Sequence, residues 1–340
     1  MIRHIQQFIL KRFFPFKDWV TDLKNPKILQ ADIIAGLTVA LVLVPQSMAY
    51  AQLAGLPPYY GLYASFLPVA IASIFGSSRQ LATGPVAVVS LLTAAALEPI
   101  ASNDPAGYVA YAIMLAFLVG FFQLSLGLLR MGVLVDFLSH PVVTGFTNAA
   151  AIIIATSQLS KLFGVSVISE EYHYQTIINV ISESLINTHT PTLLMGLLAI
   201  FIIILVRKIS YKYPAVLISV VITTLISWYI KFELNYGGKV IGVVPDGLPS
   251  IQMPHIDISQ LVHLGTVAIA ISLIGFMEAI SIAKAMATQT KQRLDADQEL
   301  IGQGLSNIAS SLFQGYPVSG SFSRSAVNIS AGAVTGFSSV

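Results

Sequence analysis

The residues best suited to chemistry lie in two stretches of helix-breaking residues that interrupt long uncharged segments. One contains Thr83-Gly84-Pro85-Val86, and the other ends in Ser323-Arg324-Ser325. Each stretch precedes a short segment of helical composition, so each should present unpaired N–H groups, such as that of Val86, and the positive end of a helix dipole. Arg324 adds a fixed charge with a planar fork that suits oxyanions, and Ser323 and Ser325 add hydroxyl donors. Together these groups predict an anion site.

An acidic residue is expected close to this site. Glu278 follows the uncharged segment from Ile258 to Met277, which places it deep inside the helix bundle. Ionisable groups at membrane depth indicate function. The balance between desolvation and the nearby arginine would let Glu278 take up a proton or Na⁺ together with the anion. The alternative is that Glu278 and Arg324 form a structural ion pair.

The first apolar segment contains Pro45-Gln46-Ser47 and Tyr50. Pro45 must leave one helix carbonyl unpaired. Gln46 and Tyr50 are four residues apart and therefore share a helix face. We expect them to contact the anion, with ordinary packing between helices as the alternative.

The elements that position these residues must be membrane-spanning helices. The chain of 340 residues is 55% hydrophobic and 10% charged, compared with about 25% charged in soluble domains. The 46 residues from Ile33 to Ser78 contain no Asp, Glu, Lys or Arg, and about 20 apolar residues suffice to cross a bilayer. No segment shows the alternation of a membrane β-barrel strand. Spans are predicted at 33–54, 58–76, 84–97, 107–129, 137–160, 190–207, 213–230, 259–288, 299–314 and 324–338.

Charge distribution predicts the orientation of these spans. With the N-terminus inside, fourteen of the 18 Lys and Arg residues fall on the cytoplasmic side, as the positive-inside rule requires. Residues 1–32, basic and rich in aromatic side chains, are expected to form a cytoplasmic interfacial segment, with a plain basic tail as the alternative. We expect a multi-pass protein of a plasma membrane, the bacterial inner membrane.

An internal repeat is also predicted. A long span, a second span, a Gly/Ser/Pro-rich break and a short helix occur in this order from Ile33 and again from about Ile258. The two copies are separated by seven spans, which forces opposite orientations in the membrane. Short broken helices in matching positions of an inverted repeat indicate a transporter site at the midplane. Residues 33–230 are thus assigned to a first repeat of seven spans and 231–340 to a partial second repeat of spans eight to ten. The alternative is that the two breaks are simple hinges.

Several classes of function are disfavoured. No nucleophile, base and orienting group occur together, so we expect no enzyme activity. The chain contains no cysteine, its histidines lack metal-ligand spacing, and a net charge of +2 does not indicate a nucleic-acid partner. No cofactor is predicted apart from a possible H⁺ or Na⁺ coupling ion.

The motifs resemble those of the sulfate permease (SulP) family, which includes the animal anion exchangers pendrin and prestin. The block from Pro58 to Arg79 fits the family signature except at Ala72, where Tyr or Ile is usual. The other matching stretches are Val42-Leu-Val-Pro45-Gln46-Ser-Met-Ala-Tyr50, Thr83-Gly84-Pro85, Gly275-Phe-Met-Glu278 and Phe322-Ser323-Arg324-Ser325.

The resemblance implies an all-α fold of fourteen spans in two inverted halves of seven, shared with uracil permeases, in which a core domain moves against a gate domain. It implies an anion held between the ends of helices three and ten, contacted by Gln46 and Tyr50, and cation or proton coupling at Glu278. It also implies a homodimer of the full-length protein, formed largely through a C-terminal STAS domain. Because the sequence stops at Val340, we expect it to contain about ten of the fourteen spans, to lack the last spans and the STAS domain, and not to transport unaided.

The expected function is therefore secondary active transport of a small inorganic anion. Sulfate coupled to H⁺ or Na⁺ is preferred on the resemblance alone, because an arginine between two helix ends suits bicarbonate equally well. A nucleobase permease of the same fold and an uncoupled anion channel are further alternatives.

Overall fold

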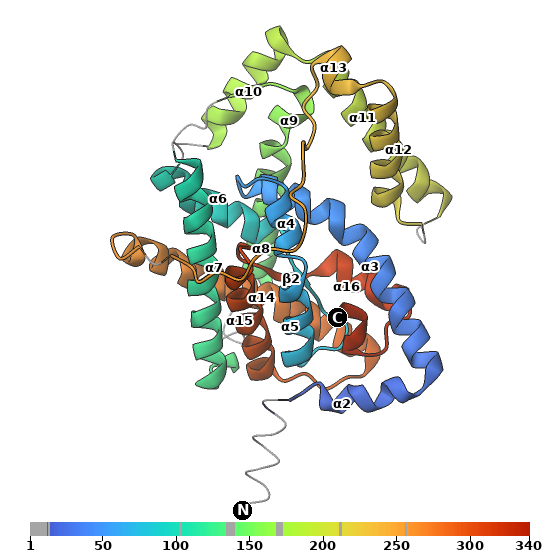
Figure 1. Cartoon of the computed structure of the whole chain (residues 1–340), viewed down its shortest axis with the longest axis vertical. Helices are drawn as coiled ribbons and strands as arrows, with labels where there is room; N and C mark the ends of the chain where they lie inside the picture. Colours follow the sequence, from blue (N-terminus) through green and yellow to red (C-terminus); the bar gives the residue numbers. More distant parts are fainter. Residues whose placement is uncertain are drawn as a thin grey trace, which may run out of the picture. The chain divides into compact units, whose positions relative to one another are not determined.

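The computed structural model describes residues 12, 14–101, 104–133, 140–167, 173–210, 213–255 and 257–340. Apart from two strands of three residues each, the regular elements in this part of the chain are helices (Figure 1). The expectation of an interfacial segment at residues 1–32 lies partly outside the described residues. Three of the cations predicted on the cytoplasmic side, Arg3, Lys11 and Lys212, also lie outside the described residues.

The described chain forms two compact units. The first comprises residues 1–143 and 245–340, and the second comprises residues 144–244. This grouping by contacts differs from the division into repeats at residue 231, since it unites the predicted spans one to four with spans eight to ten. Each unit is described separately.

The first unit begins with a short amphipathic entry. Helix α2 (Lys17–Val20) and the 3-10 helix η1 (Thr21–Lys24) lead into α3 (Pro26–Leu53). The predicted start of this span at residue 33 is wrong. Asn25 caps the helix by accepting a hydrogen bond from the Lys27 N–H at 3.1 Å, and Pro26 occupies the first turn, where its missing N–H is harmless.

The charge of Asp32 explains why the sequence suggested a later start. This side chain is fully buried in α3, yet it accepts hydrogen bonds from the N–H groups of Val334 and Thr335 and from the Thr335 hydroxyl. A buried carboxylate is tolerated when its oxygens are satisfied in this way. Asp32 therefore lies inside the helix and does not mark its end.

The second predicted span, at 58–76, is divided in two. Helix α4 (Tyr59–Tyr63) is followed by α5 (Leu67–Phe75), whose first turn contains Pro68. A strand β1 (Ala82–Gly84), helix α6 (Ala87–Ala101) and helix α7 (Pro105–Leu128) follow.

The C-terminal part of the first unit repeats this order. Helices α14 (Leu261–Thr290) and α15 (Ala296–Leu312) precede strand β2 (Ser319–Ser321), helix α16 (Phe322–Ser330) and the 3-10 helix η3 (Gly336–Ser339). Helix α16 ends well before the predicted boundary at 338. Gly332 adopts a φ of 97°, a left-handed conformation that glycine tolerates and that terminates helices.

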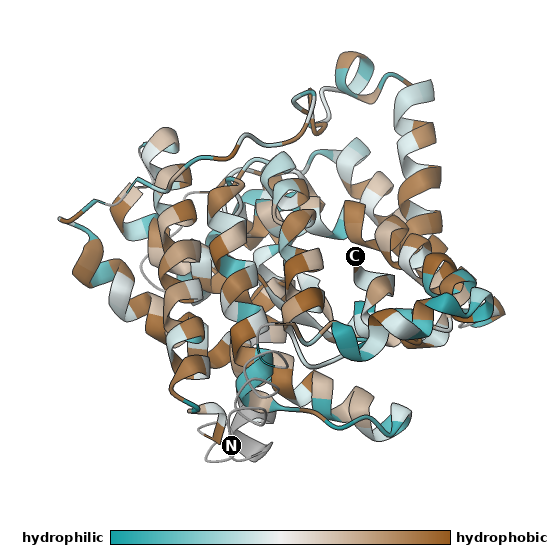
Figure 2. Cartoon of the chain, turned by 60° about the horizontal axis from the view of Figure 1, so that its bottom comes forward, coloured by the Kyte–Doolittle hydropathy of each residue, from teal (hydrophilic) through white to brown (hydrophobic). Residues whose placement is uncertain are grey.

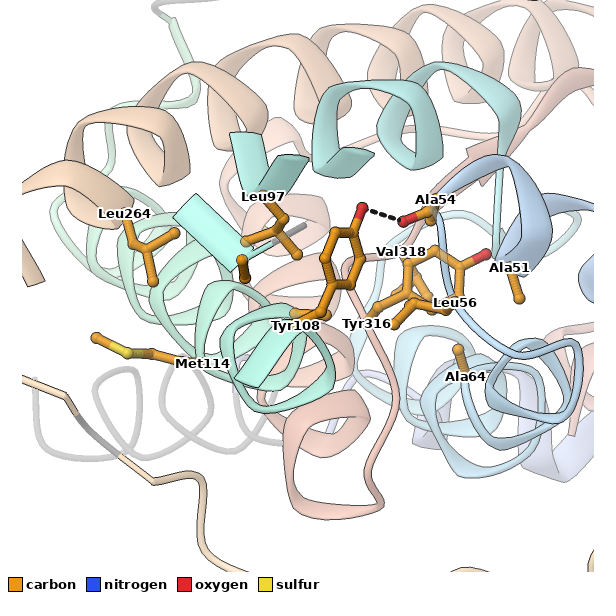
Figure 3. Packing of buried hydrophobic residues seen from close by; sticks show 12 residues of the cluster. Ala51, Ala54, Leu56, Ala64, Leu97, Tyr108, Met114, Leu264, Tyr316 and Val318 are labelled. Carbon is orange, nitrogen blue, oxygen red and sulfur yellow. Dashed lines mark hydrogen bonds between the residues drawn. The ribbon is translucent and has the colours of Figure 1, made fainter. Parts of the chain in front are cut away.

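Helix α15 packs most extensively against α7 and next against α5 (Figure 1). Glycines permit the close approach to α7, because a Cβ on Gly304 would lie 2.5 Å from the Leu124 nitrogen. Small residues at helix contacts are typical of membrane bundles. A second contact region, shown in Figure 3, buries Tyr316 and Val318 against Ala51 and Leu56, and Tyr108 there donates a hydrogen bond of 2.8 Å to the Ala54 carbonyl.

The second unit is a set of helices, most of them apolar. It comprises most of α8 (His140–Ser157) together with α9 (Leu159–Phe163), α10 (His173–Asn187), α11 (Thr190–Ile209), α12 (Ala215–Tyr229) and α13 (Phe232–Tyr236). Helix α10 is absent from the predicted spans, because its sequence mixes apolar residues with Glu183 and several amides and hydroxyls.

Among the described residues, four helices are long and apolar enough to cross a membrane: α3, α7, α11 and α14. Only 6% of the apolar window of α11 is buried within the protein. A helix with so much exposed apolar surface is stable in lipid but not in water. The predominance of apolar residues along the helices is visible in Figure 2.

Candidate anion-binding site

The two helix-breaking stretches singled out from the sequence meet in space. Strands β1 and β2 pair in an antiparallel ribbon, in which Ala82 is opposite Ser321 and Gly84 is opposite Ser319. Strand β2 leads directly into α16, and β1 leads into α6 through Pro85 and Val86. Because the strands are antiparallel, the N-termini of α6 and α16 lie at opposite ends of this short ribbon. The positive ends of two helix dipoles therefore converge at the ribbon.

Arg324 lies at this point of convergence and is fully buried. None of its three guanidinium nitrogens has a hydrogen-bond partner. Its Nη2 atom is 3.2 Å from the position that a Cβ on Gly84 would occupy, so the guanidinium reaches from α16 to the entry of α6. A buried arginine with unused donors is ready to bind an anion.

Three other polar side chains experience the charge of Arg324. Glu278 of α14, Tyr50 of α3 and Tyr316 all interact with it electrostatically. Glu278 does not form an ion pair with it in the described structure, and the Glu278 Oε2 atom is buried without a hydrogen-bond partner. The structural ion pair that the sequence left open is thus not formed in this conformation.

Helix α3 brings the predicted residues Gln46 and Tyr50 to the same region, since it packs against both α16 and α6. The Gln46 Oε1 atom is buried and lacks a hydrogen-bond partner. Both side chains are partly buried.

The remaining predicted residues lie along the ribbon. Pro85 and Val86 are buried between β1 and α6, and the Val86 carbonyl accepts the hydrogen bond of the Ser90 N–H at 3.0 Å. Ser323 is exposed in the first turn of α16. Ser325 is buried and links the two strands, because its hydroxyl donates to the Ser321 carbonyl at 2.7 Å and accepts from the Ala82 N–H at 2.9 Å.

Sequence reasoning missed Tyr316, which interacts electrostatically with Arg324, and Ser90, which contacts Tyr316. Tyr316 is fully buried, and its hydroxyl lies 3.2 Å from the Ser90 Oγ atom of α6, within hydrogen-bond distance. The position of Tyr316 between Gly315 and Pro317 was a usable signal, because an aromatic residue with a polar tip stood inside a break at membrane depth. Ser90 gave no comparable signal among the small residues of its helix.

The arrangement is a positively charged, donor-rich site suited to a small anion. Within the described residues, no group of three or more His, Cys, Asp or Glu side chains could hold a metal ion. A separate cavity of about 750 Å³ opens beyond the start of β1, where Ser78, Gln80 and Arg293 are among its lining residues. Arg324 does not line this cavity.

Two opposed short helices joined through a ribbon, within repeated helical elements, define an inverted-repeat membrane fold. A sequence model described as the sulfate permease family matches residues 29–340, and the chain belongs to this family.

Curated relatives support the assignment. The chain is 40% identical over 333 residues to "Sulfate transporter 4.1, chloroplastic" of Arabidopsis thaliana, covering 96% of this chain and 48% of that protein. It is 33% identical over 359 residues to the "Sodium-independent sulfate anion transporter" of Bos taurus, covering 96% of this chain and 58% of that protein. The chain therefore spans about half the length of the curated relatives it matches.

Solved structures confirm the predicted fold of two inverted halves. The structure of SLC26A9 superposes with a TM-score of 0.92 at 25% identity, covering 99% of this chain and 56% of that chain. The transmembrane domain of the cyanobacterial bicarbonate transporter BicA superposes with a TM-score of 0.80 at 25% identity, covering 92% of this chain and 79% of that chain. The family assignment also confirms that the chain is of a transporter class and not an enzyme class.

Proposed function

We propose that this chain forms the anion-binding part of a secondary active transporter for inorganic anions, with sulfate as the preferred substrate. The proposal rests mainly on the surroundings of Arg324, which is fully buried and whose guanidinium nitrogens have no hydrogen-bond partner. Burying an unpaired cation is very unfavourable. An anion that enters the site would supply the missing charge and the missing acceptors.

Each predicted residue has a distinct role in this proposal. Arg324 provides the charge. The N-terminus of α6, which Pro85 precedes, provides N–H donors such as that of Val86, and the N-terminus of α16 adds the hydroxyl of Ser323. Ser325 holds the strands together in the observed conformation, and its direct contact with the anion stays a prediction.

Gln46 and Tyr50 would close the site from α3. The Tyr50 hydroxyl is a donor suited to an anion, whereas the unpartnered Oε1 of Gln46 is an acceptor. An anion would be bound by the amide nitrogen of Gln46, which is a hydrogen-bond donor. The amide oxygen, which is an acceptor, would instead accept a bond from a water molecule around the anion or from a protonated anion such as bicarbonate.

Glu278 would couple anion movement to a cation. Its Oε2 is unpartnered, so a proton or Na⁺ arriving there would be bound and would offset the carboxylate charge close to Arg324. The anion and the cation would then enter a site whose net charge changes little.

Bicarbonate is the second candidate, favoured by the similarity to the transmembrane domain of BicA. An arginine between two helix ends would accept either oxyanion. Named relatives from Arabidopsis thaliana and Bos taurus are sulfate transporters, which is why sulfate is placed first. We also propose a homodimer in a plasma membrane, with the N-terminus in the cytoplasm.

A competition panel tests the proposal. Uptake of labelled sulfate by the complete protein would be measured against excess sulfate, bicarbonate, chloride, dicarboxylates and uracil, at two pH values, with and without Na⁺. Sulfate uptake that depends on a proton or Na⁺ gradient is expected. Binding of uracil by a protein that takes up no sulfate would instead identify a nucleobase permease, and passive anion current without coupling would identify a channel.

A further inference from the structure

Helix α15 presents buried polar side chains at every fourth position toward the ribbon. Glu299, Gln303 and Asn307 are each at most 2% exposed, and their spacing places them on one face of the helix. None of them belongs to the anion site described above. Polar side chains in a membrane bundle carry a desolvation penalty that their hydrogen bonds must offset.

Asn307 holds the segment that enters β2. Its Oδ1 atom accepts a hydrogen bond from the Val318 N–H at 2.8 Å, and its Nδ2 atom donates to the Val318 carbonyl at 3.0 Å. The same Nδ2 group donates to Gln123 of α7 at 3.0 Å. The side chain thus fixes both backbone groups of the residue before the strand.

Gln303 holds β1 in the same manner. Its Nε2 atom donates to the Thr83 hydroxyl at 2.9 Å, and Thr83 is the central residue of the strand. The second bond of this amide goes to Glu299 Oε1 at 3.3 Å. The Gln303 Oε1 atom has no partner, so the contribution of this residue comes from its two donor bonds.

Glu299 fixes the turn that precedes β1. Its Oε2 atom accepts hydrogen bonds of 2.9 Å from the N–H groups of both Ser77 and Ser78. One helix therefore holds the approach to β1, the middle of β1 and the approach to β2.

We propose that Glu299, Gln303 and Asn307 are positioning residues that fix the β1–β2 ribbon, and hence the separation of the α6 and α16 N-termini around the anion. This inference rests on the proposed function. The three residues do not touch the anion. They set how well its donors are aligned, because small displacements of pre-oriented groups weaken binding strongly.

The bond between Gln303 and Thr83 allows a clean test. Gln303→Met and Thr83→Val each remove this bond with little change of volume, and the double variant completes a cycle. Ser306→Ala is the matched control, since Ser306 is fully buried on the same helix but donates its 2.7 Å bond to Pro68 of α5 and not to the ribbon. The KM and kcat of sulfate uptake would be measured for the complete protein in proteoliposomes.

Thr83→Val is expected to raise the KM for sulfate by about three- to tenfold, the range for one buried hydrogen bond, with a smaller change in kcat. Gln303→Met should raise the KM at least as much, because it also removes the 3.3 Å bond to Glu299 Oε1. The double variant should raise the KM no further than the single variant with the larger effect does, and Ser306→Ala should leave the KM unchanged. Thr83→Val removes the bond without altering α15, so it provides the test if Gln303→Met is poorly produced.

An unchanged KM in the variants, or an equal rise in Ser306→Ala, would overturn the positioning role. That result is distinguishable from failure of the proposed function. In the latter case the wild-type protein itself would take up neither sulfate nor bicarbonate.

Discussion

At the scale of single residues, one buried side chain organises the site. Arg324 is fully buried, its guanidinium nitrogens are unpartnered, and Glu278 and Tyr50 lie within its electrostatic reach. The sequence pointed to Arg324 and Glu278 because charge is rare in its apolar segments, and to Tyr50 because it shares a helix face with Gln46. The signal of Tyr316 inside the Gly/Pro-rich break was overlooked, and Gln303 and Asn307 gave no signal, because their roles depend on which helices become neighbours.

Glu278 should determine the pH dependence of transport. Replacing it with glutamine keeps the shape and removes the titrating group, so the Glu278→Gln variant should take up sulfate at a rate that no longer changes with pH. Initial rates at about pH 6 and about pH 8, roughly one unit on either side of neutrality, would be compared with those of the wild-type protein.

A matched control is Glu233→Gln, an exposed carboxylate on α13, which should retain the wild-type pH profile. If the Glu278→Gln profile matched that of the wild-type protein, proton coupling would not pass through this residue.

At the scale of elements, the ribbon is the feature that creates the site. Long uncharged segments predicted most helices, because desolvation leaves few alternatives to a helix in lipid. The same segments gave no sign that residues 82–84 and 319–321 would pair, since pairing between strands so distant in sequence depends on the tertiary fold. The sequence also did not predict that α16 ends at Ser330, because the residues that follow remain mostly small and apolar.

Gly84 should be sensitive to any added side chain. Its φ of 144° is one that other residues rarely adopt, and a Cβ there would lie 3.2 Å from Arg324 Nη2. We expect Gly84→Ala to destabilise the protein by about 1–3 kcal/mol through backbone strain and to weaken sulfate uptake by displacing the guanidinium. Thermal unfolding in detergent and the KM for uptake would measure the two effects.

Gly275→Ala is the control for this substitution. A Cβ at Gly275 would make an ordinary contact of 3.5 Å with Ser319 Oγ, and alanine is the better helix former. Unfolding and uptake close to the wild-type values are expected there, and equal losses in both variants would argue against a special role of Gly84.

At the scale of the whole molecule, the fold is that of two inverted halves, as in SLC26A9 and BicA. The repeat was visible in the sequence as an order of elements and not as residue similarity. The compact units of the described chain, residues 1–143 with 245–340 and residues 144–244, were not visible from element order. Contacts between helices that are distant in sequence, such as α15 with α7, determine that grouping.

The orientation in the membrane can be measured directly, because the chain contains no cysteine. An impermeant thiol reagent added outside intact cells should label Asp246→Cys and leave Arg293→Cys unlabelled until the membrane is permeabilised. Both positions are exposed, and the distribution of Lys and Arg predicts that they lie on opposite sides of the membrane. The reverse labelling pattern would place the N-terminus outside.

The role of Arg324 in binding the transported anion can be tested by labelled sulfate uptake by the complete protein carrying Arg324→Ala. Removing one partner of a buried charge pair costs about 2–5 kcal/mol, so uptake at low sulfate should fall at least roughly 30-fold. Arg324→Lys keeps the charge without the planar fork, so its sulfate uptake should lie between that of Arg324→Ala and that of the wild-type protein. Arg207→Ala, at an exposed position on α11, should take up sulfate as the wild-type protein does. Unaltered sulfate uptake by Arg324→Ala would show that Arg324 does not bind the transported anion.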